Sequence, residues 1–533
     1  MVRDLEPLSA HAVDVLVIGG GIYALTIAYD AAQRGLSVAL IERDDFGSGT
    51  SFNHLRTIHG GLRYLQTLDI GRARESLGER RTLARLAPHM VRPLRFAVPI
   101  YPSLLRGPTA MRAGLALDRI VAWDRNDGLS ASHALPAGCV VSRDEAIQQF
   151  PGLRRQDLVG AAVFWDYVTT EADRLTFSYA LAAASQGALL ANHVEAHALL
   201  TDGKRVVGVA ARDRFSDRLV EIAATVTVNA TGGQVDRLLA PLGLATGLPL
   251  LKAMNLVTRL AASDDALGGR SACGRNLFCV PWRGRALFGT WESGRACDPD
   301  DTAIAEGDVA AFITELREAF PTIAPSVDDV TLVHCALVPA AVRGRRVTLE
   351  GHEQVRDHAK DGVEGLLSVA GTKYTTARAV ASRITDRLLA KLHRAAVPCR
   401  TGDTPLAGSV GGDVRPAGSG LSADTQEHLL AAYGPRYGDV VALAGERSDW
   451  RARVAPESPV IGAELVWAAR AEMAMTLSDA VIRRTPLGAL GYPGDVAVAR
   501  AAVLVGDELG WTEDQRREEI AIVKRFYALS QSV

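Results

Sequence analysis

Cysteine is scarce in this 533-residue chain, and no two cysteines form a CxxC pair. Structural zinc sites and small disulfide frameworks both depend on closely patterned cysteines, so neither is expected. Scattered thiols of this kind are typical of reduced proteins of the cytosol. The six lie at Cys139, Cys273, Cys279, Cys297, Cys335 and Cys399.

A long uninterrupted apolar segment is also missing. No window approaches the roughly 20 apolar residues that a membrane-spanning helix needs. The first residues, Met1-Val2-Arg3-Asp4, are not followed by the apolar stretch of a signal peptide. We therefore expect a cytoplasmic protein whose contact with a membrane is at most peripheral.

An excess of charge of one sign is absent as well. The 59 Lys and Arg residues and 61 Asp and Glu residues leave a formal net charge of −2. No overall field then favours nucleic acid or acidic lipid, so no nucleic-acid partner is expected. The chain is longer than the roughly 250–300 residues at which a single core stops growing, which predicts two or three structural units. Nothing in the composition decides whether the protein forms oligomers.

What the sequence does contain is a strand–helix–strand pattern at its start. A buried strand is predicted over 13–18, an alanine-rich helix over 22–34 and a second strand over 37–42. A glycine-rich turn separates the first strand from the helix. This arrangement is typical of the first unit of a dinucleotide-binding fold.

The turn has the form Gly19-x-Gly21-x-x-Ala24, and Glu42 closes the second strand. Gly19 permits a tight turn, Gly21 lets the backbone approach a pyrophosphate, and Ala24 allows close helix–strand packing. The helix N-terminus offers free N–H groups to the same anion. Glu42 lies at the expected spacing to accept hydrogen bonds from a ribose diol. Together they predict a dinucleotide site.

Later segments favour FAD over a nicotinamide cofactor. Gly-rich or hydroxyl-bearing turns recur far along the chain, and a flavin needs such distant pieces because its tricyclic ring lies far from its pyrophosphate. A helix that begins near Thr375 would direct its positive end at the flavin, although alone this turn is better explained as an ordinary helix cap. The turns lie at 46–51, 59–65, 229–232 and 371–376.

Several strings now match one family in order along the chain. The sequence resembles the FAD-dependent glycerol-3-phosphate dehydrogenases and glycerophosphate oxidases of the D-amino-acid-oxidase superfamily. The string His59-Gly60-Gly61-Leu62-Arg63-Tyr64-Leu65 is specific to that family, whereas the glycine fingerprint is not. The other matching strings lie at 17–22, 48–51, 86–90, 92–96, 173–175, 228–232, 367–373 and 472–485.

The resemblance implies an α/β fold with a Rossmann-like FAD-binding domain, an antiparallel β-sheet substrate domain and a C-terminal α-helical domain. The expected boundaries are 1–400 for the FAD-dependent oxidoreductase module, 401–420 for a Gly- and Pro-rich linker and 421–533 for the helical domain. Within the module we expect FAD-binding parts at about 11–85, 150–245 and 355–398, and the substrate sheet at about 86–149 and 246–354.

The resemblance also implies a reaction: hydride transfer from a small alcohol, nominally glycerol 3-phosphate, to N5 of noncovalently bound FAD, giving dihydroxyacetone phosphate. Electrons would then pass to a quinone or to oxygen. His59 is the expected base and Lys373 the residue that holds an anionic substrate group or the flavin carbonyl; the alternative for His59 is that it only packs on the flavin. The expected cofactor-binding residues are Gly19, Gly21, Ala24, Glu42, Thr50, Ser51, His59, Gly60, Gly61, Leu62, Val194, Ala230, Thr231, Gly232, Gly371, Thr372, Lys373 and Thr375.

The substrate side departs from the family. Val338 stands where the family carries a substrate-binding arginine, and a second family arginine has no clear counterpart near 350–352. The expected pocket residues are Arg56, Asn255, Trp291 and Val338. Two alternatives therefore stay open: oxidation of a non-phosphorylated alcohol or amine, such as a sugar, cyclitol or natural-product intermediate, and a flavin-binding protein without turnover. Arg56, Lys373, Arg343 and Arg345 are the cations that could replace the arginine. No metal site is predicted, and His193 and His197 are interpreted as ordinary residues.

Overall fold

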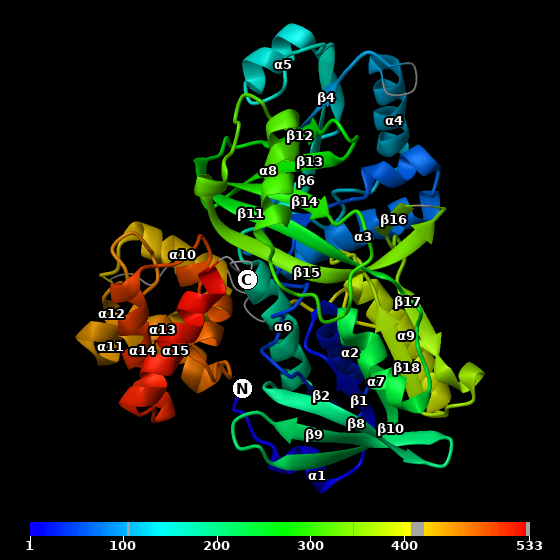
Figure 1. The fold of residues 1–533 in the computed structure, drawn as a ribbon, viewed down its shortest axis with the longest axis vertical. Helices are drawn as coiled ribbons and strands as arrows, with labels where there is room; N and C mark the ends of the chain where they lie inside the picture. Colours follow the sequence, from blue (N-terminus) through cyan, green and yellow to red (C-terminus); the bar gives the residue numbers. More distant parts are fainter. Residues whose placement is uncertain (104–106, 345, 407–419, 529–533) are drawn as a thin grey trace.

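The computed structural model describes residues 1–103, 107–344, 346–406 and 420–528. Most of the linker expected at 401–420 therefore lies outside the described residues. Two sheets are stacked along the long axis of the molecule, and the C-terminal helices gather beside them (Figure 1). The fold class expected from the sequence is confirmed.

The first sheet is the dinucleotide-binding one, and its central strands are parallel. Alternate side chains of β1 enter two different cores: Val15 and Val17 face three helices, whereas Leu16 and Ile18 face the opposite side. Its strands, in spatial order, are β17 (Gln354–Asp357), β18 (Leu366–Ala370), β10 (Leu219–Asn229), β1 (Val13–Ile18), β2 (Val38–Ile41) and β7 (Leu189–Ala191), with β8 (Val194–Asp202) and β9 (Arg205–Asp213) attached to β10.

Helices cover both faces of this sheet. The packing on the first face is close because α2 is rich in alanine and fully buried along most of its length. That face carries α2 (Ile22–Gln33), α6 (Ala172–Ser185) and α9 (Ala377–Lys391). The other carries α1 (Glu6–Ala10), α7 (Val235–Leu239) and the β8–β9 ribbon.

The second sheet is antiparallel except where β12 runs parallel to β4. Its strands, in spatial order, are β16 (Arg346–Leu349), β15 (Val330–Arg343), β11 (Leu250–Ala261), β14 (Arg285–Glu292), β13 (Asn276–Trp282), β12 (Ala266–Arg270), β4 (Val91–Ile100), β6 (Gly160–Thr169) and β3 (Thr57–Ile58), with β5 (Cys139–Ser142) on β6. Its accompanying helices are α4 (Pro108–Val121), α5 (Arg143–Gln149) and α8 (Glu306–Ala319), while α3 (Ile70–Leu86) lies between the two sheets, with contacts to β4 and to α9.

Two strands of this sheet fall inside segments that we expected in the FAD-binding part. β6 pairs with β4 along its whole length, and β3 pairs with the end of β6. The chain therefore crosses between the two sheets at 57–58 and again at 160–169. These crossings bring the residues that follow β3 to the boundary between the sheets.

The C-terminal helices form their own core and pack on the second sheet (Figure 1). They are α10 (Ala423–Tyr433), α11 (Tyr437–Glu446), α12 (Ser448–Arg451), α13 (Gly462–Ala471), a π-helical turn (Asp479–Arg484), α14 (Asp495–Leu509) and α15 (Glu513–Tyr527). α13 ends at Ala471, because Met473 adopts φ 55° and the Glu472 side chain turns inward to Arg174, at 2.8 Å. Among the described residues no helix is long and apolar enough to span a membrane.

Candidate active site

The glycine turn lies where β1 meets its parallel neighbour β10. Gly19 has φ 114°, and a Cβ there would lie 2.6 Å from the Ala230 carbonyl oxygen. The Ala230 N–H in turn donates to the Ile18 carbonyl at 2.9 Å. The structure therefore brings the first glycine of the motif against the 230–232 turn, which lies more than 200 residues later.

The start of α2 offers space and donors for a pyrophosphate. A Cβ at Gly21 would meet only the Ser51 hydroxyl, at 3.3 Å. The same hydroxyl accepts the N–H of Ile22 at 2.9 Å. Backbone donors at a helix N-terminus, with no side chain over them but a small hydroxyl, suit an anionic diphosphate. Ala24 is fully buried below them.

Glu42 follows β2, and its carboxylate points back to the turn. It accepts the N–H groups of Gly20 and Asp44, at 2.5 and 2.9 Å, while burial raises its pKa to about 7. The Val194 N–H donates to the Glu42 carbonyl at 2.8 Å. Because a ribose diol brings two hydroxyl donors, this carboxylate fits the adenosine end of a dinucleotide.

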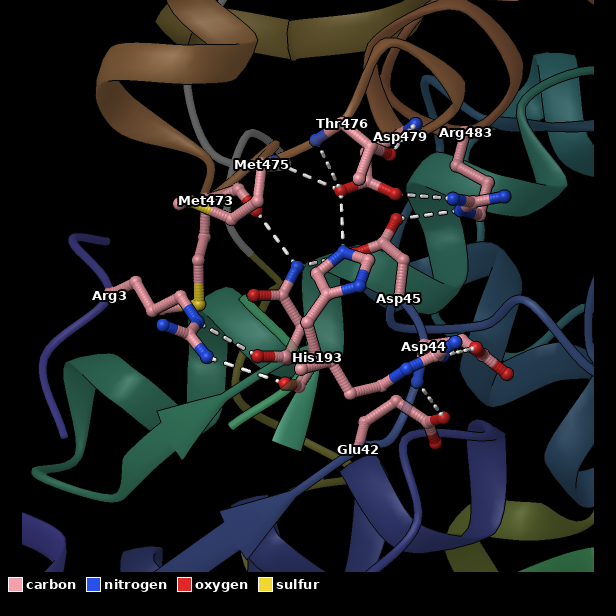
Figure 2. A network of polar contacts seen from close by, with 12 residues as sticks. Arg3, Glu42, Asp44, Asp45, His193, Met473, Met475, Thr476, Asp479 and Arg483 are labelled. Atoms are coloured by element: carbon pink, nitrogen blue, oxygen red, sulfur yellow. Dashed lines mark hydrogen bonds and ion pairs between the residues drawn. The ribbon is translucent and has the colours of Figure 1, made fainter. Parts of the chain in front are cut away.

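A buried polar network behind Glu42 ties the loop that follows β2 to the helical domain (Figure 2). The ring of His193 contacts Asp479 at 2.8 Å, and Asp479 also accepts the N–H groups of Met475 and Thr476. His193 is therefore part of an interdomain contact, whereas His197 is exposed. Although burial opposes the charged imidazolium, the facing carboxylate of Asp479 raises the pKa of His193 above its usual value.

Three residues of this network have the side chains of metal ligands. Ligand atoms of Asp45, His193 and Asp479 lie within 4.8 Å of one another. Arg483 and Arg484 each contact Asp45 at 2.7 Å. Since two guanidinium groups already neutralise the carboxylates, the cluster is an ion-pair network.

The hydroxyl-bearing turn at 371–376 packs against α2. A Cβ at Gly371 would overlap the hydroxyl of Tyr23, which donates to the Lys373 carbonyl at 3.1 Å. The Thr372 hydroxyl donates to the Glu350 carbonyl at 2.8 Å, and Thr375 is buried just before α9 begins. The turn is thus held next to the N-terminal end of α2, an arrangement that suits a long flavin dinucleotide.

His59 lies between β3 and the short 3-10 helix at Leu62–Thr67. The next residue, Gly60, donates its N–H to the Asp166 carboxylate at 2.8 Å, and Asp166 pairs with Arg80 at 2.5 Å. Gly61 has φ 77°, and a side chain there would overlap the ring of Tyr64. The backbone on the C-terminal side of His59 is therefore fixed by a buried ion pair and a glycine-only turn.

Lys373 reaches this turn from the other side. Its Nζ donates to the Ser76 hydroxyl and lies 4.5 Å from the centre of the Tyr64 ring. Burial lowers the pKa of Lys373. Because Tyr64 packs on the same turn that carries His59, the structure brings the two expected catalytic residues to one region.

The expected substrate residues do not all meet there. Asn255 and Val338 share one face of the β11–β15 pair, since side chains alternate along antiparallel strands. Asn255 accepts the Thr290 hydroxyl at 2.8 Å. Val338 packs in an apolar cluster with neighbours on β11 and β16. Trp291 faces α8 on the opposite side, where its Nε1 donates to Glu315 at 3.1 Å.

Arg56 is enclosed beneath the helical domain. Its guanidinium lies 5.3 Å from the Phe52 ring and 4.7 Å from the Trp282 ring, and its nearest carboxylate is Asp173 at 3.6 Å. Burial lowers its pKa. Nε, Nη1 and Nη2 have no hydrogen-bond partner within the described part of the chain. In this structure Arg56 packs against two aromatic rings of the core that the helical domain shares with the second sheet.

One side chain near Lys373 was not predicted. Arg72, in the first turn of α3, lines a small pocket between α3 and the 350–353 segment. The Arg72 guanidinium lies 4.2 Å from the centre of the Tyr64 ring, which Lys373 also contacts. No motif in the sequence marks Arg72, because its position depends on a contact across almost 280 residues. The pocket is lined by Tyr23, Arg72, Glu75, Gly351, His352, Glu353, Thr372, Lys373 and Thr376.

Comparison with known proteins identifies this arrangement. Residues 14–387 match the family model described as FAD dependent oxidoreductase, and residues 399–516 match the C-terminal domain of alpha-glycerophosphate oxidase. The chain therefore belongs to the FAD-dependent oxidoreductases, FAD is its cofactor, and the expected resemblance is confirmed.

The relatives are more specific. The chain is 31% identical to the glycerol-3-phosphate dehydrogenase of Synechocystis sp., over 97% of both chains, and 33% identical to that of Mycobacterium leprae, over 97% of this chain and 88% of the relative. Its fold is similar to that of the Bacillus halodurans glycerol-3-phosphate dehydrogenase solved with FAD, with a TM-score of 0.77 at 23% identity, covering 99% of this chain and 98% of that one.

Proposed function

We propose that this protein oxidises glycerol 3-phosphate to dihydroxyacetone phosphate. The observation that carries the proposal is the match to glycerol-3-phosphate dehydrogenases over nearly the whole chain, helical domain included. When bound, FAD supplies the hydride acceptor. The residues proposed to hold it are the cofactor set expected from the sequence, centred on Gly19, Gly21 and Glu42 at one end and Lys373 and Thr375 at the other.

His59 is proposed as the base that takes the proton of the substrate hydroxyl. An imidazole suits this role because its ordinary pKa lies near neutral pH. It can accept a proton when neutral and release that proton again once it is protonated. The fixed backbone at Gly60 and Gly61 would hold the ring at one distance from the substrate. Lys373, buried beside the same turn, is proposed to contact the substrate or the flavin carbonyl.

The acceptor of the electrons is proposed to be a quinone or oxygen. Contact with a membrane, if a quinone is used, would be peripheral. The two acceptors are separated by assaying the same preparation with a soluble quinone under argon and with oxygen alone.

The test is anaerobic reduction of the purified holoenzyme. Glycerol 3-phosphate should bleach the flavin absorbance in a single turnover and yield one dihydroxyacetone phosphate for each flavin. Glycerol serves as the matched substrate without phosphate and glycine as an amine. Absence of bleaching by glycerol 3-phosphate overturns the proposal.

The apolar surroundings of Val338 favour a second candidate, an alcohol without phosphate. A phosphate dianion that leaves water needs matched donors, and valine offers none. Faster reduction by glycerol or a larger polyol than by glycerol 3-phosphate would support this candidate.

A further inference from the structure

Because Val338 stands in place of the family arginine, the positive charge that would bind a substrate phosphate is missing from β15. Its position is filled by a side chain that is 5% exposed among apolar neighbours. The second family arginine would fall near 350–352, where Gly351 supplies no side chain. A substrate phosphate therefore needs a cation from another element.

Arg72 is placed at this gap. A Cβ at Gly351 would lie 2.8 Å from its Nη1 and 3.4 Å from its Nη2. The guanidinium thus occupies the space that a side chain at position 351 would enter. The N-terminal turn of α3 fixes the backbone of Arg72, because the Arg72 N–H donates to the helix cap Asp69 at 3.1 Å.

Arg72 and Lys373 bring two positive charges to the pocket, and the charge of Glu75 acts on Lys373 without forming an ion pair with it. Within the described ranges no carboxylate forms an ion pair with either cation. The two acidic residues of the pocket, Glu75 and Glu353, are both paired with Arg383 on α9. Two cations that each lie within 4.5 Å of the centre of one aromatic ring, next to backbone without a side chain, form a site for an anion.

We propose that Arg72, together with Lys373, binds the phosphate group of the substrate and replaces the arginines that are missing at 338 and near 350–352. This inference rests on the proposed function. A guanidinium is well suited to the role, since its planar fork can donate two hydrogen bonds to one phosphate.

The experiment uses the FAD-loaded enzyme and the variants Arg72→Leu and Arg72→Lys. In anaerobic stopped-flow reduction by glycerol 3-phosphate, Arg72→Leu should raise the Kd by about 10- to 100-fold, the usual worth of a charge-assisted hydrogen bond, and more than it changes the limiting rate. Inorganic phosphate, used as a competitive inhibitor, should lose affinity in parallel. Arg72→Lys should recover part of the loss, because it keeps the charge without the fork.

Arg74→Leu is the matched control. Arg74 lies on the same helix two residues later, but its guanidinium pairs with Asp124 at 2.5 Å and donates to the Val121 carbonyl. Its Kd for glycerol 3-phosphate should stay within twofold of the parent.

A second variant guards against loss of folding in Arg72→Leu. Gly351→Ala places a methyl group against the Arg72 guanidinium and should weaken both ligands through displacement of that group. If Arg72→Leu binds glycerol 3-phosphate and inorganic phosphate as tightly as the parent does, the proposal is overturned. If Arg72→Leu does not fold, parental affinity of both Arg72→Lys and Gly351→Ala for these anions overturns it. If the parent is not reduced by glycerol 3-phosphate, the proposed function fails instead, and phosphate affinity alone then decides whether Arg72 forms an anion site.

Discussion

Alanine substitutions at Gly19 and Gly21 should separate folding from cofactor binding, although the two glycines are only two residues apart. At Gly19 the backbone has φ 114°, and the new Cβ would lie 2.6 Å from the Ala230 carbonyl oxygen. That oxygen belongs to the backbone just after β10, so it has little freedom to move. Strain of about 1–3 kcal/mol and overpacking of about 1–3 kcal/mol give a loss of roughly 2–6 kcal/mol in the free energy of unfolding, with or without FAD.

Gly21→Ala should behave differently. Its φ is −76°, an ordinary value for any residue, and the new methyl would meet only the Ser51 hydroxyl at 3.3 Å. The apoprotein should therefore keep its stability within about 1 kcal/mol of the parent. FAD affinity should fall by about 10- to 100-fold, because the methyl stands over the helix N-terminus that the pyrophosphate needs.

The assay is urea unfolding of the apoproteins with and without FAD, with flavin content measured from absorbance. When FAD is at 100 times its Kd, binding adds about 2.7 kcal/mol to the stability of the parent, and a 100-fold weaker Kd would reduce this to about 0.4 kcal/mol. Full FAD-dependent stabilisation of Gly21→Ala would refute the assigned pyrophosphate site. Unchanged apoprotein stability in Gly19→Ala would refute the strain argument.

Three further predictions address the base and the domain contact. His59→Asn should retain FAD but slow anaerobic flavin reduction by about 10²–10⁴-fold, and a variant reduced at the parental rate would restrict His59 to packing. Arg174→Met should lower the free energy of unfolding by about 3–5 kcal/mol in urea, because it leaves the buried Glu472 carboxylate unpaired; Arg174→Met with Glu472→Leu should lose less, and an equal or larger loss would contradict the pairing argument. His193 has a raised pKa in the folded protein, so its contribution is fully present below its ordinary pKa of about 6.5 and is lost as pH rises through the raised value; the stability difference between parent and His193→Gln should shrink over that window, and a constant difference would exclude an ionised histidine.

The parts of the fold that the sequence predicted are those set by local patterns. The strand at 13–18, the glycine turn and the helix that follows are encoded within 30 residues, and the structure shows all three. The membership of β3 and β6 in the second sheet could not be predicted from local patterns. Ile58 pairs with Tyr167 over more than 100 residues, and nothing in either segment specifies its partner. The end of α13 at Ala471 likewise depends on a tertiary contact, the pair of Glu472 with Arg174.

The cofactor-binding residues could be predicted from the sequence because the binding of a dinucleotide constrains the backbone conformation. A tight turn and a close approach of the backbone to another group both need glycine, so Gly19 and Gly371 can be recognised from the sequence. The substrate side has no such constraint. Trp291 was expected in the pocket from the family resemblance, but strand alternation directs it to α8.

Charge can be supplied to a pocket from any element that borders it, and this explains why Arg72 was missed. A missing arginine at Val338 looks like the loss of a function when positions are compared one at a time. In space, the region between α3 and the 350–353 segment still holds a guanidinium and an ammonium around one tyrosine ring. The absence of a side chain at Gly351 is what makes room for Arg72. The loss of an arginine on β15 is therefore offset by an arginine on α3, and a phosphate-bearing substrate can still find two cations at this site.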